Sequence, residues 1–388
     1  MRPILLSGAF SDIRVRAGKL VLTEAYGSER RLLEYNPMNL DFENVVVTNP
    51  SGNITIQAIY WLSRNNIPVL MLNFNGELMS MLDMPITNAK TRIKQYEAYT
   101  KRRVAVAKQF IMGKLKHTED FLIWLSDRYN IDMKRFAFPE AYTKLQEAKS
   151  LKSIMGVEGI TANAYWSEMS KVFHQSKFEV GNRDIGRTNR PMNAIDEVNA
   201  LLNYGYTYLE SLIQKCLISN GLDPSIGFLH EIASGKRPLT YDFIEPYRFL
   251  VDWSMVRGLE TNVFNKDEFS RDNLAFSIKI GKKAVEKLIR LIQESLSARV
   301  KYKSAEWQWY TLINDKTREF SRDFKVDLSL PGFTAERTDK KDLREKILKM
   351  SYAEWKKMGY SKGSLWYMKH NLDKGSFKLY DKSLEKLS

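Results

Sequence analysis

The stretch IPVLMLNFNGELMSMLDMPITNAKTRIKQYEAYTKRRVAVAKQF, residues 67–110, contains the change of pattern that decides the fold. Before Pro85, two short apolar runs flank Asn75-Gly76, a dipeptide typical of tight β-hairpin turns. Beyond Pro85, apolar residues recur every three or four positions, which is the spacing of one face of an α-helix. The stretch therefore predicts strands on its N-terminal side and helices on its C-terminal side.

The sequence on either side extends both patterns. DIRVRAGKLVLTEA alternates around Ala17-Gly18, ENVVVTN resembles a buried strand, and ITIQAIYWLSRNN indicates one short helix among the strands. Helical spacing continues to about residue 325, with loops at 182–191, 219–223 and 234–239. We therefore predict an α+β protein with a β domain at 1–86, an α-helical domain at 87–330 and a separate tail at 331–388.

The tail indicates a helix-turn-helix. Residues 340–350 form one helical run, and Ser351 with Glu354 matches a capping box that opens a short helix ending at Gly359. A further helix begins near residue 361 and carries Lys362 and Lys369, which are candidates for DNA contact. The tail holds 14 Lys and Arg against 8 Asp and Glu, a net charge of +6. This charge fits phosphate contacts, although many solvated helices are similarly basic.

The net charge, the cysteine content and the lengths of the apolar stretches restrict the classes of protein to which the chain could belong. The 388 residues carry a net charge of +14, which favours a polyanionic partner, with nucleic acid ahead of an acidic membrane surface. Cys216 is the single cysteine, so intramolecular disulfides and cysteine-cage zinc sites are excluded, and its apolar helical run predicts a core position. No apolar stretch is long enough to span a membrane, and a cytoplasmic location is expected.

The segment FLHEIASGKRPLTYDFIEPYR, residues 228–248, holds the first candidate site. His230, Asp242 and Glu245 would supply an imidazole and two carboxylates, a ligand set suited to Mn²⁺ and usable by Mg²⁺. The structural alternative is that Asp242 caps a helix, Glu245 completes the capping box, and His230 is a hydrogen-bonded core residue. A further ligand could come from Glu158, whose neighbours Gly156 and Gly159 leave room for close backbone approach.

Three ordered motifs carry a resemblance to a known family. They are GVEGITANAYW at 156–166, NRPMNAIDEVNALLNYGY at 189–206 and GLDPSIGFLHEIASGKRPLTYDFIEPYR at 221–248. Together with the β-then-helical order, they resemble the CRISPR-associated integrase-endonuclease family Cas1 over about residues 1–325. The resemblance implies a divalent metal, Mn²⁺ or Mg²⁺, that assists attack of a DNA 3′-hydroxyl on a target phosphodiester.

The resemblance also assigns roles to individual residues. The metal ligands and catalytic residues fall on Glu158, His230 and Glu245, and some relatives have aspartate where Glu245 stands. Asp242 and Tyr165 match auxiliary positions. Arg190 and Arg248 match recurring basic positions that contact DNA phosphate or orient a carboxylate; for Arg248 the alternative is an ion pair with Asp252, four residues on.

The C-terminal tail helps to distinguish between the two branches of the family. LWYMKHNLDKGSFKLYDK resembles the C-terminal extension of casposases, the transposon-encoded branch, which we favour; some archaeal CRISPR members carry similar tails. A CRISPR member would act in spacer acquisition with its small partner Cas2. Both branches imply double-stranded DNA as substrate and a homodimer formed through the β domain, with four-subunit assembly on DNA as an extension. A non-catalytic DNA-binding protein and an RNA-directed nuclease remain alternatives from other classes.

Overall fold

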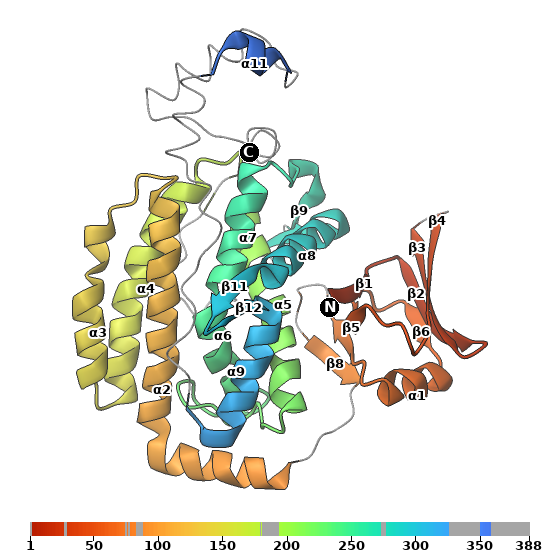
Figure 1. The fold of residues 1–388 in the computed structure, drawn as a ribbon, viewed down its shortest axis with the longest axis horizontal. Coiled ribbons are helices and arrows are strands. Elements are labelled where there is room, and N and C mark those ends of the chain that lie inside the picture. Colours follow the sequence, from red (N-terminus) through yellow and green to blue (C-terminus); the bar gives the residue numbers. More distant parts are fainter. Residues whose placement is uncertain are drawn as a thin grey trace. The chain divides into compact units, whose positions relative to one another are not determined.

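The computed structural model describes residues 2–26, 29–73, 76, 78–82, 88–178, 180, 194–272, 277–325 and 350–357. The chain divides into two compact units, one comprising Met1–Leu259 with Val263–Phe333, the other Glu260–Asn262 with Thr334–Ser388. The first unit contains an N-terminal β-rich region followed by a helical region (Figure 1), as predicted. The α+β class is thereby confirmed, whereas the domain boundaries at 86 and 330 stay predictions.

The described strands of the N-terminal region form two four-stranded sheets. One has the order β1-β5-β7-β8, in which β1, β5 and β7 are parallel and β8 is antiparallel to β7. The other has the order β4-β3-β2-β6, in which only the β2–β6 pair is parallel. The bounds are β1 Arg2–Leu6, β2 Phe10–Arg16, β3 Lys19–Tyr26, β4 Glu29–Tyr35, β5 Phe42–Val47, β6 Gly52–Ile54, β7 Val69–Leu72 and β8 Leu78–Leu82.

The predicted turns have residues of left-handed backbone conformation between their strands. Ala17 and Gly18, between β2 and β3, have φ of 46° and 77°, so both central residues of this tight hairpin are left-handed. Gly76, between β7 and β8, has φ of 84°. Because a side chain clashes with the backbone in this region of φ, glycine suits both turns. The two hairpins predicted from the sequence are therefore confirmed by the β2–β3 and β7–β8 pairing.

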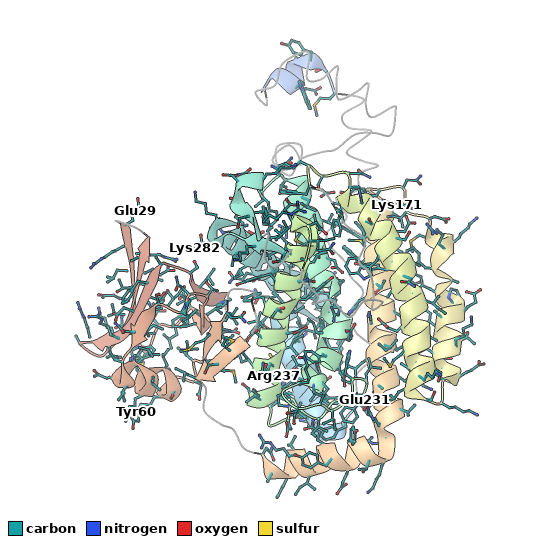
Figure 2. The ribbon with its side chains drawn as sticks, turned by 180° about the vertical axis from the view of Figure 1, so that it is seen from behind. Glu29, Tyr60, Lys171, Glu231, Arg237 and Lys282 are labelled. Atoms are coloured by element: carbon teal, nitrogen blue, oxygen red, sulfur yellow. The ribbon has the colours of Figure 1, made fainter. Side chains whose placement is uncertain are left out.

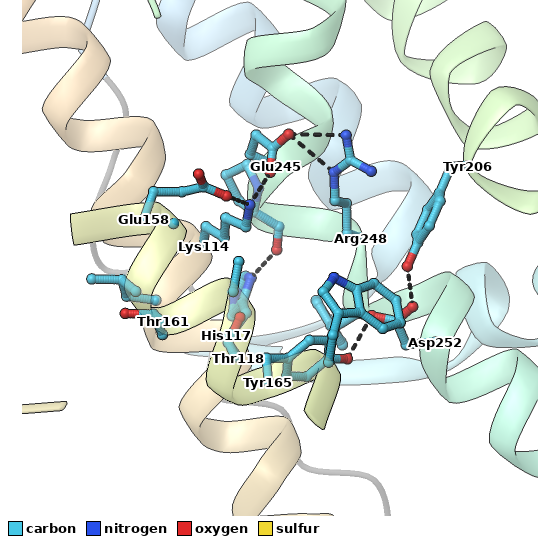
Figure 3. Close-up of a pocket in the computed structure, with 16 residues that line it drawn as sticks. Lys114, His117, Thr118, Glu158, Thr161, Tyr165, Tyr206, Glu245, Arg248 and Asp252 are labelled. Atoms are coloured by element: carbon cyan, nitrogen blue, oxygen red, sulfur yellow. Dashed lines mark hydrogen bonds and ion pairs between the residues drawn. The ribbon is translucent and has the colours of Figure 1, made fainter. Parts of the chain in front are cut away.

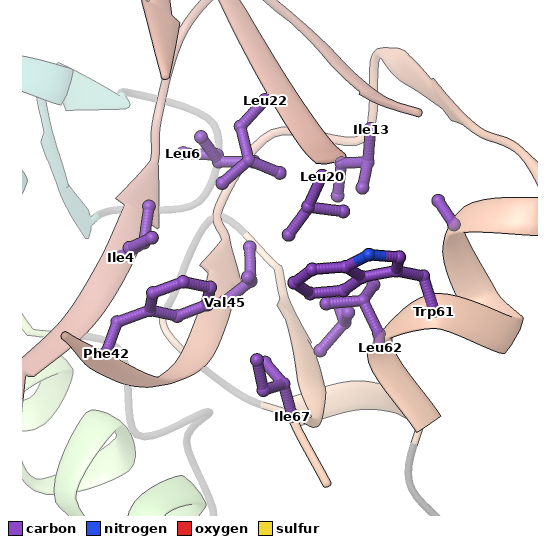
Figure 4. Packing of buried hydrophobic residues seen from close by; sticks show 12 residues of the cluster. Ile4, Leu6, Ile13, Leu20, Leu22, Phe42, Val45, Trp61, Leu62 and Ile67 are labelled. Atoms are coloured by element: carbon purple, nitrogen blue, oxygen red, sulfur yellow. The ribbon is translucent and has the colours of Figure 1, made fainter. Parts of the chain in front are cut away.

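The short helix α1 (Ile56–Arg64) covers the apolar core between the sheets (Figure 4). The side chain of Thr55 accepts the amide of Ala58 and caps the helix. Trp61 packs into the core and its indole Nε1 donates to the carbonyl of Gly18 at 2.9 Å, which joins the helix to the β2–β3 turn. Tyr60, on the opposite side, projects outward with 68% of its surface exposed (Figure 2).

Long helices build the remainder of the first unit. Their bounds are α2 Ala89–Ser126, α3 Phe138–Glu147, α4 Leu151–Phe173, α5 Glu197–Ser219, α6 Pro238–Ile244, α7 Phe249–Glu260, α8 Lys282–Ser297 and α9 Trp309–Asp323, with 3-10 turns η1 Met133–Phe136, η2 Glu245–Tyr247 and η3 Lys266–Glu268. Helix α2 runs along α4 and η2, and it is kinked at Arg102, where φ is −136°. The helix α5 is buried along most of its length, and Cys216 within it is 2% exposed, which confirms its predicted core position.

Two small hairpins interrupt the helical region where the helical pattern was expected to continue. They pair β9 (Phe269–Asp272) with β10 (Ser277–Ile280), and β11 (Arg299–Tyr302) with β12 (Ala305–Gln308). Along β11, Val300 and Tyr302 are buried while Arg299 and Lys301 are exposed, the two-residue alternation of a strand with one covered face. Four residues give too short a pattern to distinguish from a helix end.

In the second unit, α11 (Tyr352–Lys357) opens with the predicted capping box. The amide of Glu354 donates to Ser351 Oγ at 3.3 Å, and the amide of Ser351 donates to Glu354 Oε2 at 2.7 Å. The helix predicted after residue 361 and the end at Gly359 lie outside the described residues. Across the described part of the chain, none of the helices has the length and apolar character needed to cross a membrane.

Candidate metal and DNA site

Helices α2, α4, α5 and α7 and the turn η2 line a cavity of about 240 Å³ (Figure 3). Its walls combine charged and aromatic side chains from segments far apart in the sequence. The polar and aromatic lining residues are Lys114, His117, Thr118, Glu158, Thr161, Tyr165, Trp166, Tyr206, Glu245, Arg248, Phe249 and Asp252. Two of the three predicted metal ligands, Glu158 and Glu245, thus lie in the wall of one cavity.

Lys114 lies between these two carboxylates (Figure 3). Its Nζ donates a short hydrogen bond to Glu158 Oε1 and forms an ion pair of 2.6 Å with Glu245 Oε2. The side chains are 20%, 28% and 6% exposed for Lys114, Glu158 and Glu245, respectively, so the pairs are only partly screened by water. Burial alone would lower the pKa of Lys114, but Glu245 and Glu158 outweigh it and raise the pKa. The ammonium is therefore a charged bridge between the carboxylates.

The apolar pattern of α2 explains the position of Lys114. Ala107, Phe110, Ile111 and Leu115 are buried on the face that meets the rest of the helical region. Lys114 falls within the same helical stripe, three residues after Ile111, where an apolar side chain would be expected. A lysine at such a position needs a buried acidic partner, because desolvating an unpaired charge is costly.

Helix α4 presents Glu158 from its second turn. Ser150 caps the helix through a reciprocal pair of hydrogen bonds with Ser153. Gly156 and Gly159 do not mark the close backbone approach that the sequence suggested, since a Cβ built on either would meet nothing within 4 Å outside its own helix. The glycines instead leave the helix surface beside Glu158 bare.

Glu245 is held from a second side by Arg248. The guanidinium nitrogens Nε and Nη2 each lie 3.0 Å from Glu245 Oε1, and the guanidinium also stacks over the ring of Tyr206, 4.9 Å from its centroid. Burial raises the pKa of Glu245, but Arg248 and Lys114 outweigh it and lower the pKa to about 2. The proposed pair of Arg248 with Asp252 is absent among its described contacts, so the guanidinium orients Glu245.

Asp242 does not cap a helix, which makes the capping interpretation wrong. It lies inside α6, fully buried, and its carboxylate faces the chain at 228–230. Asp242 Oδ2 accepts the amides of Phe228 and Leu229, the latter at 3.0 Å, and Oδ1 accepts the amide of His230 at 3.0 Å. Oδ1 also lies 2.7 Å from Nδ1 of His230. Asp242 therefore fixes both the backbone and the ring of His230.

His230 is the predicted ligand that does not line the cavity. Its side chain is 38% exposed, so it is not the core histidine of the structural alternative. Burial lowers its pKa, but the hydrogen bond and charge of Asp242, together with the charge of Glu245, outweigh burial and raise the pKa. His230 is thus close enough to Glu245 for their charges to interact, and its Nδ1 is committed to Asp242.

Among the described residues, no three His, Cys, Asp or Glu side chains are already gathered as a complete metal site. The donor chemistry nevertheless fits a hard divalent cation. Glu158 and Glu245 converge on one positive charge, and His230 offers Nε2 because Asp242 takes Nδ1. Two carboxylates and one neutral imidazole nitrogen form a set suited to Mn²⁺ and usable by Mg²⁺.

The loop that carries His230 is anchored to α2. The fully buried Gln95 donates to the carbonyls of Asp223 and Ile226 at 2.9 Å each, and its Oε1 accepts the amide of Asp223 at 2.9 Å. Arg103 Nε donates to the carbonyl of Phe228 at 3.0 Å. Helix α2 therefore positions the His230 loop as well as Lys114.

A second polar group lies deeper in the same cavity. Tyr165 donates its hydroxyl to Asp252 Oδ2 at 2.6 Å, and Tyr206 donates a short hydrogen bond to Oδ1 of the same carboxylate (Figure 3). Asp252 is only 2% exposed, so the two tyrosines satisfy a carboxylate that water cannot reach. Tyr165 thus lies in the cavity wall but contacts Asp252. Trp166, the next residue along α4, is half-buried and also lines the cavity.

The sequence reasoning assigned no site role to Lys114, His117, Tyr206 or Asp252, all of which line the cavity. Lys114 and Asp252 carried a usable signal, a charged residue inside an otherwise apolar helical stripe. His117 is 1% exposed and its Nδ1 lies 2.5 Å from the carbonyl of Pro246, which joins α2 to η2. The other predicted DNA-binding residues, Arg190, Lys362 and Lys369, lie outside the described residues.

Comparison with known proteins places the chain in a family. The family model of CRISPR associated protein Cas1 matches residues 6–294. The CRISPR-associated endonuclease Cas1 1 of Archaeoglobus fulgidus is 29% identical over 316 residues, which are 76% of this chain and 89% of the relative. A fusion of CRISPR-associated exonuclease Cas4 and endonuclease Cas1 from Leptospira interrogans is 27% identical over 59% of this chain and 44% of its own length.

Solved structures agree with this placement. A casposase bound to integration product superposes with a TM-score of 0.79 at 33% identity, covering 91% of this chain and 100% of that one. A Cas1 protein from Thermotoga maritima shares the fold, with a TM-score of 0.64 at 17% identity over 83% of this chain and 96% of that one. Because the family model spans well over half of the sequence, the chain belongs to the Cas1 family.

Proposed function

We propose that this chain is a metal-dependent DNA integrase and endonuclease that joins a DNA 3′-hydroxyl to a target phosphodiester. The observation that carries the proposal is the convergence of Glu158 and Glu245 on a single positive charge. A position that holds one ammonium between two carboxylates has the charge balance that a divalent cation needs. The 33% identity to a casposase bound to integration product, over 91% of this chain, supports the same chemistry.

Glu158, Glu245 and His230 are the proposed ligands. Asp242 is a positioning residue, because its hydrogen bond to Nδ1 leaves Nε2 of His230 for the metal. Arg248 positions Glu245 through its two contacts with Oε1. The bound cation would lower the pKa of the attacking hydroxyl and offset charge that develops on the phosphate. No serine or cysteine nucleophile is required, and Cys216 is buried.

The casposase branch is the favoured role. The casposase is 33% identical to this chain, and the match covers 91% of this chain. The match to the Cas1 protein of Archaeoglobus fulgidus covers 76% of this chain at 29% identity. The capped helix α11 lies in the basic tail, where a casposase-like helix-turn-helix is predicted. The alternative role is CRISPR spacer acquisition, and it is supported by the similarity to CRISPR-associated Cas1 proteins of Archaeoglobus fulgidus and Methanobrevibacter ruminantium. A structural neighbour described as a Cas6-RT-Cas1–Cas2 complex suggests Cas2 as the partner in that case.

Double-stranded DNA is the proposed substrate and partner. The net charge of +14 supports phosphate contact, and Arg190, Lys362 and Lys369 remain proposed DNA-binding residues. We further propose a homodimer formed through the 1–86 region, with the 87–330 region as the catalytic part and four subunits assembling on DNA. Each of these assemblies rests on the family membership and on charge.

The test uses purified full-length protein with Mn²⁺, a labelled duplex with free 3′-hydroxyls, and a supercoiled plasmid. Labelled plasmid is expected, and it should be lost in the Glu158→Gln variant. Glu147→Gln, an exposed carboxylate on α3, is the matched control and should transfer label normally. Unchanged transfer by Glu158→Gln would disprove the site assignment. Transfer only after addition of Cas2 would favour the CRISPR role.

If no label is transferred under any of these conditions and DNA binding is sensitive to salt, the alternative of a non-catalytic DNA-binding protein would be favoured. Cleavage of RNA in place of DNA under the same conditions would favour the RNA-directed nuclease.

A further inference from the structure

We propose that Lys114 is a built-in counter-cation that holds Glu158 and Glu245 together before a divalent ion binds and that leaves its position when the ion arrives. The inference rests on the proposed metal site and adds a residue that the ligand set does not contain. It starts from the geometry of one ammonium group, which contacts one oxygen of each carboxylate.

The electrostatics of the cavity wall require a positive charge at this position. Glu158 and Glu245 would otherwise repel each other across a partly buried wall, since Glu245 is 6% and Glu158 28% exposed at the side chain. Arg248 cannot supply the charge for both, because its described contacts reach only Oε1 of Glu245 and not Glu158. Lys114 is therefore the cation that joins α4 to η2.

A divalent ion on the same two carboxylates cannot share their inward oxygens with the ammonium. The Lys114 contact with Glu245 Oε2, at 2.6 Å, is a strong charge interaction that a divalent ion on the same oxygen would replace. The lysine stem is flexible, which allows the ammonium to withdraw from the carboxylates without a change in α2. Metal binding and the Lys114 bridge are thus mutually exclusive, and the bridge weakens the apparent affinity for the metal.

The first measurement is Mn²⁺ binding by calorimetry to the full chain, without DNA. Lys114→Gln should bind Mn²⁺ about tenfold more tightly than the unmodified protein, the scale on which one neighbouring charge shifts a site equilibrium. Its melting temperature without metal should fall, because the two carboxylates then repel. Lys108→Gln is the control, since Lys108 lies on the same helix and donates to the carbonyl of Gln146, away from the site.

The outcomes separate this inference from the proposed function. If the unmodified protein binds Mn²⁺, Glu158→Gln abolishes binding, and folded Lys114→Gln binds equally or more weakly, the displacement inference is wrong and the metal site stands. If the unmodified protein shows no Mn²⁺ binding that depends on Glu158, both fail. Chemical acetylation of Lys114 in the protein without substitutions, measured by mass spectrometry, gives a readout that needs no variant. It should rise when Mn²⁺ is added, and unchanged acetylation would overturn the inference.

Discussion

Asp242 and His230 are joined by a contact of 2.7 Å between a carboxylate oxygen and Nδ1, and the same carboxylate accepts the backbone amides of residues 228–230. The loop and the imidazole are thus fixed by one fully buried group. The arrangement turns Nδ1 inward and leaves Nε2 as the nitrogen for a ligand. If His230 binds the proposed metal, a change at Asp242 should alter both stability and metal affinity.

Replacing Asp242 with Asn should affect both properties. The amide group presents a donor where the amides and the ring now find acceptors, so we expect a loss of about 3 kcal/mol in the free energy of unfolding. Mn²⁺ affinity should fall by about 10- to 100-fold, as for other residues that orient a metal ligand. Urea unfolding and calorimetry measure the two effects. Asp323→Asn, exposed at the end of α9, should change neither.

Replacing His230 with Ala should abolish strand transfer while leaving the fold intact. The side chain is 38% exposed, so little apolar surface is lost, whereas one of the three proposed metal ligands disappears. We expect at least about a 100-fold fall in product, larger than the loss for a residue that only orients a ligand. His174→Ala, in an exposed position at the end of α4, is the matched histidine control. Equal transfer by both variants would remove His230 from the site.

The Tyr165–Asp252–Tyr206 group should behave as one unit. Each Tyr→Phe change removes a hydrogen bond to a buried carboxylate and should cost about 1.5–3 kcal/mol of unfolding free energy. The two changes share one acceptor, so the double variant should differ from the sum of the single variants. Tyr60→Phe, 68% exposed on α1, should have almost no effect. Strict additivity in urea unfolding would contradict a shared acceptor.

Cys216 should resist alkylation in the folded protein. Burial raises the pKa of its thiol from 9.0 to about 11, so little thiolate forms near pH 8 and reagents lack access. Mass spectrometry should find the thiol unmodified until the protein is unfolded. Rapid labelling of the native protein at pH 8 would contradict the buried position.

The same thiol contributes a pH dependence of stability. Its folded pKa lies above its unfolded value, so the folded chain keeps a proton that the unfolded chain releases. The contribution is present below about pH 9 and is lost as the pH rises toward about 11. The difference in unfolding free energy between the unmodified protein and Cys216→Ala, measured from pH 8 to 11, isolates this contribution from that of the tyrosines. A difference that stays constant with pH would rule it out.

Local patterns determined most of the fold. Alternation and left-handed turn residues predicted the β2–β3 and β7–β8 hairpins, and helical spacing predicted the change of class after Pro85. The hairpins and the helices both depend on interactions between residues that are close in the sequence, so their patterns can be recognised from the sequence alone. The β9–β10 and β11–β12 hairpins were not predicted, because strands of four residues are too short to show the two-residue alternation of a strand.

The sequence by itself determined the motifs, the net charge and the identity of the acidic and histidine candidates. Only the tertiary structure decided how they are used. Asp242 proved to fix His230 and its loop, Arg248 pairs with Glu245, and Lys114, from a helix more than a hundred residues earlier than Glu245, lies between the two carboxylates. Charge interactions depend on distance in space, and a linear sequence does not contain the distances between segments that meet only after folding.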